Sequence, residues 1–153
     1  MKVFVTGATG CLGRQLVQLL LAHDCEVTAL VRTFDRARSL PAGVRPASGD
    51  ITQRASLRAG MRGAEVVFHA AASTRPGPGE RDAARLDRVN VDGTREVLEL
   101  AAELGGPRVV FTSDLEIYGD TGGLVLDEAH LPPSPRLESA YARSKRRALL
   151  EVV

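Results

Sequence analysis

The sequence has few cysteines and almost no net charge, and each shortage excludes a class of protein. Only two cysteines, Cys11 and Cys25, occur among 153 residues. They are too few for a disulfide framework and lack the spacing of metal ligands, so we expect a reduced, cytoplasmic setting and no metal site. Twenty basic and nineteen acidic side chains leave a net charge of +1. This balance argues against a nucleic-acid-binding protein, which needs a basic surface.

Long hydrophobic runs are also missing. The longest apolar stretches are far shorter than the roughly 20 residues of a membrane span, and we expect no membrane association and no secretory signal before the first strand. The length suits one domain with a core of its own. We therefore expect a single domain over residues 1–153.

The most informative segment is a glycine-rich turn near the start of the chain. Gly7, Gly10 and Gly13 follow an apolar run, Lys2–Thr6, and precede an amphipathic one. A strand, a glycine turn and a helix in this order are typical of the phosphate-binding turn of dinucleotide folds. Gly7 would permit the sharp turn, Gly10 the approach of a pyrophosphate, and Gly13 close packing of the helix, whose N-terminus would offer free N–H groups. The alternative is a purely structural turn, because a glycine triplet alone is a weak signal.

Strand and helix patterns alternate along the rest of the chain. Apolar, β-branched runs predict strands at Lys2–Thr6, Glu26–Val31, Val44–Ala47, Glu65–His69 and Arg108–Thr112. Helical periodicity occurs at Leu12–Ala22, Asp35–Leu40, Gln53–Ala59, Asp82–Leu104 and Leu137–Val153. Near-continuous hydrophobicity, as in Val109-Val110-Phe111, is typical of strands buried on both faces. The alternation predicts an α/β fold, a doubly wound, Rossmann-type parallel sheet with helices on both faces.

Two ionisable residues lie four positions apart in the last helical segment. Tyr141 and Lys145 would share one helix face, with Lys145 beneath Tyr141. A nearby ammonium stabilises a phenolate, so we expect the pKa of Tyr141 to lie below its usual value of about 10. Such a tyrosine can act as a general acid or base near neutral pH. Asn90 is the polar member of an apolar stripe in Asp82–Leu104, which a satisfied core amide would explain equally well.

The end of the second predicted strand bears on the choice of cofactor. A carboxylate at this place binds the ribose 2′-hydroxyl of NAD, whereas here the residue is Arg32. Arg32 and Arg14 together would suit the 2′-phosphate of NADP, because guanidinium groups match phosphate oxygens. The sequence therefore favours NADP. Asp35 is close enough to keep NAD as an alternative, and Arg32 could instead simply face solvent.

Several motifs, in order, resemble those of the extended short-chain dehydrogenases/reductases, the NAD(P)-dependent epimerase/dehydratase group. The run Thr6-Gly7-Ala8-Thr9-Gly10-Cys11-Leu12-Gly13 resembles the TGATGFLG turn of that family. The other matching segments are Gly49-Asp50-Ile51, His69-Ala70-Ala71-Ala72, Asn90-Val91-Asp92-Gly93-Thr94, Tyr118-Gly119, Asp127-Glu128 and the Tyr141/Lys145 pair. The resemblance covers essentially the whole chain and implies a nicotinamide-dinucleotide-binding Rossmann domain.

The resemblance also implies roles for individual residues. Tyr141 would transfer the hydroxyl proton, and Lys145 would tune Tyr141 and bond the nicotinamide ribose. Ser113 would polarise a carbonyl, and Asn90 would support the active site. Asp50 would contact the adenine amino group. The cofactor-binding residues would be Gly7, Thr9, Gly10, Cys11, Leu12, Gly13, Arg32, Asp50, Ile51, Ala70, Ala71, Ala72, Asn90, Thr112, Tyr141 and Lys145.

One position departs from the family pattern. The catalytic Ser/Thr of the family lies five residues before the glycine of Tyr118-Gly119, where this chain has Asp114. Either Ser113 substitutes through a backbone shift, or the hydrogen-bond donor is missing. A third alternative is that Ser113-Asp114-Leu115-Glu116 resembles the Thr-Asp-Glu run of sugar-nucleotide dehydratases with one extra residue, and Glu116 removes a proton next to a carbonyl. The interpretation we favour is that Asp114 and Glu116 form a solvated loop edge.

Members of the resembled family continue into a further strand or two and a substrate-binding lobe, and we expect this chain to lack that lobe. The predicted function is an NAD(P)-dependent oxidoreductase or epimerase acting on a carbonyl or secondary alcohol of a small-molecule substrate such as a nucleotide-sugar. The rival hypothesis is a catalytically impaired, nucleotide-binding sensor or scaffold. The segments Asp82–Leu104 and Leu137–Val153 form dimer contacts in the resembled family, so we expect a homodimer.

Overall fold

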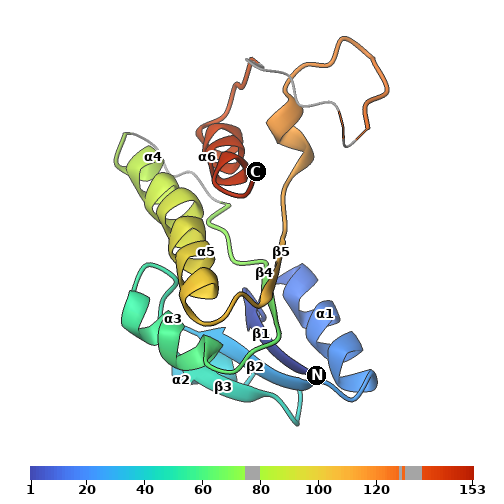
Figure 1. Cartoon of the computed structure of the whole chain (residues 1–153). Helices are drawn as coiled ribbons and strands as arrows, with labels where there is room; N and C mark the ends of the chain where they lie inside the picture. Colours follow the sequence, from blue (N-terminus) through green and yellow to red (C-terminus); the bar gives the residue numbers. More distant parts are fainter. Residues whose placement is uncertain (75–79, 128, 130–135) are drawn as a thin grey trace.

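Five parallel strands form one sheet at the centre of the computed structural model, which describes residues 1–74, 80–127, 129 and 136–153 (Figure 1). Their spatial order is β3-β2-β1-β4-β5. The strands are β1 (Lys2–Thr6), β2 (Glu26–Val31), β3 (Arg45–Ser48), β4 (Val66–His69) and β5 (Arg108–Phe111). The order reverses between β1 and β4, and ligands of open α/β sheets bind at such a reversal, beyond the carboxyl ends of the strands. Glu128, predicted as part of a family motif, lies outside the described residues.

Helices cover both faces of the sheet, as predicted (Figure 1). They are α1 (Cys11–Ala22), α2 (Phe34–Ala37), α3 (Arg54–Met61), α4 (Glu80–Asp87), α5 (Gly93–Glu103) and α6 (Ala140–Leu150). Successive side chains of β1 point to opposite faces. Val3 and Val5 pack with Val17 and Leu20 of α1. Phe4 packs on the other face, in a cluster with Leu57 and Met61 of α3 and Val97 and Leu100 of α5.

The strand β5 departs from the prediction that it is buried on both faces. Val109 packs against the core cluster beneath α3 and α5, but Val110 is 40% exposed. Since β5 is an edge strand, and α1 packs against β1 and β2, the second face of β5 receives less cover from the described helices. Continuous hydrophobicity identified the strand correctly but overstated its burial.

The segment Asp82–Leu104, predicted as one helix, is interrupted. A π-helical turn, η1 (Arg88–Asp92), separates α4 from α5. Within it the Gly93 N–H donates to the Arg88 carbonyl, five residues back, and the Thr94 hydroxyl donates to the Asn90 carbonyl at 2.6 Å. Such turns are rare and occur mostly at functional sites. Periodicity cannot reveal the turn, because a single extra residue hardly changes the apolar stripe.

The last helix is shorter than the predicted Leu137–Val153. It begins at Ala140 after the N-cap Ser139, whose hydroxyl accepts from the Ala142 N–H at 2.8 Å. It packs against α4 and η1, with ion pairs from Arg147 to Asp87 at 2.5 Å and from Arg95 to Glu151 at 2.6 Å. These contacts place α6 beside the carboxyl end of β5 (Figure 1).

Candidate functional site

A cavity of about 660 Å³ lies at the carboxyl edge of the sheet, around the point where the strand order reverses. Residues that follow β1, β2, β3 and β4 line it, and Val89 and Arg85 close one side. Nine of the predicted cofactor-binding residues contribute to the lining: Gly7, Thr9, Gly10, Arg32, Asp50, Ile51, Ala70, Ala71 and Ala72. The glycine turn and the cavity therefore occupy the same place.

The turn after β1 needs glycine at two positions for reasons of space. Gly7 has φ +75°, and a Cβ there would come within 2.6 Å of the Ala70 and Ala71 backbone. A Cβ on Gly13 would approach the Gly7 carbonyl oxygen to 2.1 Å, so its absence lets α1 start directly against the turn. The N-cap of α1 is Gly10, and no described side chain caps its first N–H groups. These N–H groups can bind an anionic ligand by donating hydrogen bonds to it.

Two arginines at the far side of the cavity bear on the NADP hypothesis. Arg32 lines the cavity, as does Arg36 of α2, which sequence reasoning missed. Arg14, expected to join Arg32, does not contribute to the lining; its Nε donates to the Thr9 carbonyl at 3.2 Å. The predicted helix Asp35–Leu40 contained Arg36, but no pattern in the sequence marked which of its side chains would face the cavity.

The carboxylate of Asp50 has partners within the protein. Its Oδ1 accepts from the Thr52 N–H at 2.9 Å and from the Thr52 hydroxyl at 2.8 Å. These bonds fix the turn after β3 and orient the Asp50 carboxylate at the edge of the cavity. Contact with an adenine amino group stays a prediction.

A buried hydrogen-bond chain joins the glycine turn to the π-helical turn. The Thr6 hydroxyl lies 2.7 Å from His69 Nδ1, and His69 Nε2 lies 3.0 Å from the Thr94 hydroxyl. Since the Thr94 hydroxyl donates its proton to the Asn90 carbonyl, His69 must donate through Nε2 and accept through Nδ1. Burial lowers the pKa of His69 to about 4, with a further contribution from the charge of Lys145. The imidazole is therefore neutral.

The amide of Asn90 holds two segments together. Its oxygen accepts from the Ser73 N–H at 2.7 Å, and its nitrogen donates to the Ser73 carbonyl at 3.1 Å and to the Ser144 hydroxyl at 2.8 Å. The side chain is buried. Asn90 is thus a satisfied core amide that links the loop after β4 to α6. A direct part in catalysis stays a prediction.

The structure overturns the expected effect on Tyr141. The phenol donates to Asp114 Oδ2 at 2.9 Å, and burial together with this bond raises the pKa of Tyr141 above its usual value. The prediction that Lys145 lowers the pKa was wrong because it considered only helix spacing. A carboxylate from another segment is the hydrogen-bond partner of the phenol.

Lys145 is nevertheless placed beside the end of β5. Its Nζ donates to the Thr112 carbonyl at 2.7 Å and lies 4.6 Å from the centre of the Phe111 ring. Burial lowers the pKa of Lys145, and the negative charge of Asp114 opposes that shift. Tyr141, Lys145, Thr112 and Asp114 therefore gather where β5 ends and α6 passes.

Asp114 and its neighbours Ser113 and Glu116 differ in exposure and in hydrogen bonding. Ser113 and Glu116 are exposed, whereas Asp114 is half-buried. The Glu116 carboxylate accepts from the Ser139 hydroxyl at 3.0 Å. The solvated-edge interpretation thus fits Glu116 but is wrong for Asp114. Tyr141 is paired with Asp114, not Ser113, and the carbonyl-polarising role of Ser113 stays a prediction.

The cavity does not extend to every predicted residue. Its described lining does not include Cys11, Leu12, Gly13, Asn90, Thr112, Tyr141 or Lys145. Sequence reasoning, in turn, missed Ser73, Thr74 and Arg85 in the lining. Ser73 and Arg85 are linked, since Arg85 donates to the Ser73 hydroxyl at 3.2 Å.

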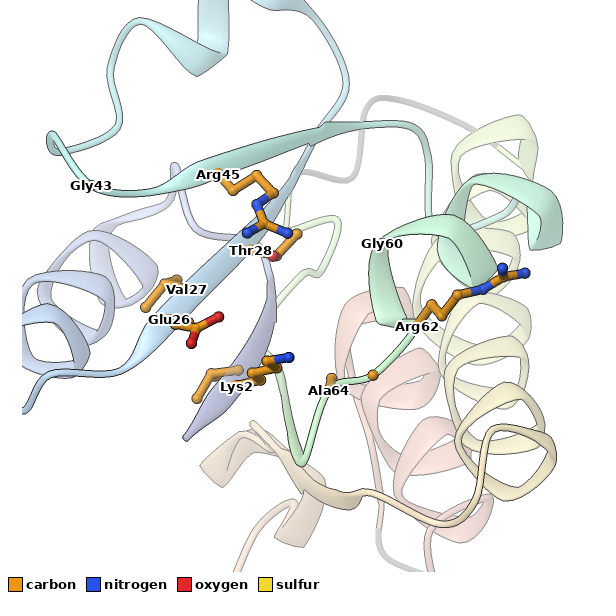
Figure 2. Close-up of a pocket in the computed structure, with 11 residues that line it drawn as sticks. Lys2, Glu26, Val27, Thr28, Gly43, Arg45, Gly60, Arg62 and Ala64 are labelled. Atoms are coloured by element: carbon orange, nitrogen blue, oxygen red, sulfur yellow. The ribbon is translucent and has the colours of Figure 1, made fainter.

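A second, smaller cavity of about 220 Å³ lies at the opposite, amino-terminal edge of the sheet. Figure 2 shows Arg45 extending toward Thr28, with Glu26 and Lys2 nearby and Arg62 directed away. These charged side chains are exposed. The predicted site residues among the described part of the chain lie away from it, at the carboxyl edge.

Neither a membrane-spanning helix nor a three-ligand metal site is found among the described residues. None of the helices there is both long and apolar enough to cross a membrane. Nor do the described His, Cys, Asp and Glu side chains form a group of three that could bind a metal.

One family model matches nearly the whole chain. The NAD dependent epimerase/dehydratase family matches residues 3–152. A ketoreductase of Stigmatella aurantiaca that acts on a farnesylated 3-oxo-dihydroquinoline oxide, by its name, is 37% identical over 97% of this chain and 44% of its own length.

Solved structures agree. A short-chain dehydrogenase/reductase superfamily protein of Agrobacterium tumefaciens with bound NAD has a TM-score of 0.84 and 28% identity, covering 99% of this chain and 44% of that one. UDP-glucose 4-epimerase of Thermus thermophilus in complex with NAD has a TM-score of 0.84 and 29% identity, covering 99% and 50%. The chain thus spans half or less of the length of these proteins. It belongs to the NAD-dependent epimerase/dehydratase family, within the extended short-chain dehydrogenases/reductases.

Proposed function

We propose that the chain is the cofactor-binding and proton-transfer region of an NAD(P)-dependent oxidoreductase or epimerase acting on a secondary alcohol or carbonyl. The observation that supports this most strongly is the coincidence of the Gly7–Gly13 turn with the large cavity at the carboxyl edge. A dinucleotide bound there supplies the hydride chemistry. The family membership makes an enzyme of this general class the natural conclusion.

The residues around the cavity fit a dinucleotide. The crowded turn at Gly7 brings backbone toward the cavity, and the free N–H groups of α1 would bind the pyrophosphate. Asp50 would bind the adenine end, and Ala70 to Ala72 would lie along the cofactor without charge or bulk. Arg32 and Arg36 would bind a 2′-phosphate, which favours NADP; NAD, bound in both related structures, is the alternative.

The proton-transfer step would use the group at the end of β5. Tyr141 would exchange a proton with the substrate oxygen, and Lys145 would supply positive charge beside it and bond the nicotinamide ribose. The bond from Lys145 to the Thr112 carbonyl would hold the ammonium in position for both tasks.

The experiment measures binding and turnover separately. Tyr141→Phe should abolish hydride transfer from NADPH across a panel of ketones and aldehydes while leaving NADPH binding, measured by calorimetry, within a few-fold of wild type. Tyr118→Phe, the chain's other tyrosine, is the control. Retained turnover in Tyr141→Phe would remove Tyr141 from the mechanism, and absence of heat with both NADPH and NADH would refute the proposal.

One observation favours a second function. Tyr141 is tied to Asp114 and its pKa is raised, so the phenol is poorly disposed to act as a free acid–base group. A chain that binds the cofactor without turnover would serve as a nucleotide-responsive sensor or scaffold. Binding of NADPH combined with no turnover of any panel member, by wild type or by Asp114→Ser, would favour this function.

The oligomeric state is part of the same proposal. We expect a homodimer formed by the segments Asp82–Leu104 and Leu137–Val153, as in the resembled family. The helices α5 and α6, which lie in these segments, both carry exposed side chains. Sedimentation velocity would test this, and a single monomeric species at micromolar concentration would contradict it.

A further inference from the structure

The carboxylate of Asp114 is held rigidly at the place where the family has a hydroxyl. Its Oδ1 accepts from the Glu116 N–H at 2.9 Å and so caps the 3-10 turn η2 (Leu115–Tyr118). Its Oδ2 accepts from the Tyr141 phenol at 2.9 Å. Both oxygens are therefore engaged, and neither can rotate away without losing a bond. The carboxylate is part of the site, not a mobile surface group.

An ionised carboxylate only accepts hydrogen bonds. The phenol proton of Tyr141 consequently points at Asp114, and the free lone pairs of the phenol oxygen face outward. A carbonyl oxygen reaching Tyr141 would find no donor, whereas a hydroxyl would find an acceptor. One N–H of the Lys145 ammonium is bonded to the Thr112 carbonyl, away from the bond between the phenol and Asp114.

We propose that Asp114 and Tyr141 form a proton-accepting dyad, in which Asp114 takes the phenol proton as Tyr141 takes the proton of a substrate hydroxyl. In its ionised form the dyad selects an alcohol, not a carbonyl compound, as the bound ground state. This inference rests on the proposed function and specifies its substrate class: a secondary alcohol, with the oxidised nicotinamide dinucleotide as co-reactant.

The transfer balances in atoms and electrons. The substrate O–H bond breaks as a new bond to Tyr141 Oη forms, and the original Oη–H bond breaks as a bond to Asp114 Oδ2 forms. The carbinol carbon loses hydride to the oxidised dinucleotide, and its C–O bond becomes a C=O bond. Asp114 is half-buried and lies beside the exposed Glu116, so it can return its proton to water.

The negative charge of Asp114 also sets the resting state of the dyad. The same charge supports the raised pKa of Tyr141, to which burial contributes most. Without a substrate, the phenol therefore stays protonated and bonded to Asp114.

The first test needs no cofactor. In a Tyr118→Phe background Tyr141 is the only tyrosine, and its ionisation can be followed by ultraviolet absorbance as pH rises. Asp114→Asn should shift this titration to lower pH by about one unit or more, since it removes a charge beside the phenol. Asp120→Asn is the matched control, because Asp120 also caps a turn, accepting from the Gly122 N–H at 2.9 Å. Identical titrations of the Asp114 and Asp120 variants would overturn the dyad.

The second test measures turnover and substrate binding, beginning with cyclohexanol and cyclohexanone. For Asp114→Asn we expect kcat/KM for oxidation to fall about 10²-fold or more, which is the usual contribution of a positioned acid–base group. The pH profile of oxidation should differ between Asp114→Asn and wild type, because the variant lacks the carboxylate that accepts the phenol proton. Asp114→Ser should reverse the binding preference, so that the ketone binds more tightly than the alcohol.

The outcomes separate the two proposals. Oxidation and reduction kcat/KM must fall by the same factor at one pH, because a catalyst does not change the equilibrium, so the pH profile and binding preference are the decisive readouts. Turnover with an unchanged profile in Asp114→Asn refutes the dyad and leaves the proposed function intact. No turnover by wild type or either variant refutes the proposed function, and the dyad as a catalytic device with it.

Discussion

The carboxyl ends of β1 and β5 lie at the same edge of the sheet, but the groups available for binding and chemistry differ between them. After β1 the chain offers main-chain groups, and glycines let the backbone fold tightly around Ala70 and Gly7. After β5 it offers side chains, with Asp114, Tyr141 and Lys145 drawn from two distant segments. A backbone site depends on local conformation, whereas a side-chain site depends on which segments meet. The spacing of residues in the sequence therefore predicts the backbone site after β1, but it does not predict the side-chain site after β5.

The largest expected effect tests the backbone region. Gly7→Ala should destabilise the fold by on the order of 4 kcal/mol, because a Cβ there meets the Ala70 backbone at 2.6 Å in addition to the positive-φ penalty. Gly63→Ala is the matched control, since Gly63 has φ +76° and nothing within 4 Å of its added Cβ. Urea unfolding should show that Gly63→Ala costs only about 1 kcal/mol. Equal costs would mean that crowding at Gly7 is unimportant.

The next effect tests His69, which connects the two regions. The folded-state pKa of His69 is lowered from 6.5 to about 4. Between these values the unfolded chain binds the extra proton, so stability is complete above pH 6.5 and falls as pH decreases toward 4, by on the order of 3 kcal/mol. Urea unfolding at several pH values should show a weaker pH dependence for His69→Gln than for wild type. A wild-type slope that persists unchanged in the variant would assign it to other groups.

A smaller effect tests the link between the loop after β4 and α6. Asn90→Ala removes three hydrogen bonds and leaves the Ser73 backbone and the Ser144 hydroxyl without them. We expect a loss of about 2 to 3 kcal/mol of unfolding free energy, and about 1 kcal/mol for Ser144→Ala, which removes only one of the three. Thermal unfolding monitored by circular dichroism would measure both. If Ser144→Ala costs as much as Asn90→Ala, the bonds to Ser73 contribute little.

The smallest expected effect is on cofactor affinity, and it tests the positive charge of Arg36 at the cavity. Arg36→Gln should weaken NADPH binding by about tenfold, the loss expected for one charge-assisted bond to a phosphate, with little change for NADH. Arg38→Gln removes an exposed arginine of the same region that does not line the cavity and serves as control. Calorimetric titrations with both dinucleotides would measure the ratio. Parallel losses for NADH and NADPH would argue against a 2′-phosphate contact.

Much of the fold could be predicted because its signals are local. Alternating apolar segments identified five strands, and their order along the chain implied a parallel sheet with helices on both faces. Some helix boundaries shifted, as at Ser139, where the cap starts the last helix at Ala140, three residues after the predicted start at Leu137. The π-helical turn at Asn90 was missed because the backbone bond from Gly93 to Arg88 adds one residue to a turn without visibly changing the apolar stripe.

In the candidate site, too, the parts that depend on local sequence were predicted and the parts that depend on distant contacts were not. Residues of the glycine turn and of the segments after β3 and β4 were correctly placed at the cavity edge, since parallel strands all end there. The pKa of Tyr141 was predicted in the wrong direction, because helix spacing pairs it with Lys145 and says nothing about Asp114, 27 residues away. Arg36 was missed because Arg32 lies in the turn before α2, so helical spacing does not relate the two side chains.

By itself the sequence determined the parallel sheet, the glycine turn and the family, because hydrophobic alternation and glycine geometry act over a few residues. Only the tertiary structure decided that Asp114 meets Tyr141, that His69 is buried between two threonines, and that Lys145 bonds the Thr112 carbonyl. The physical reason is distance along the chain. Proton affinities depend on burial and on charges brought together by packing, and these are properties of the folded molecule.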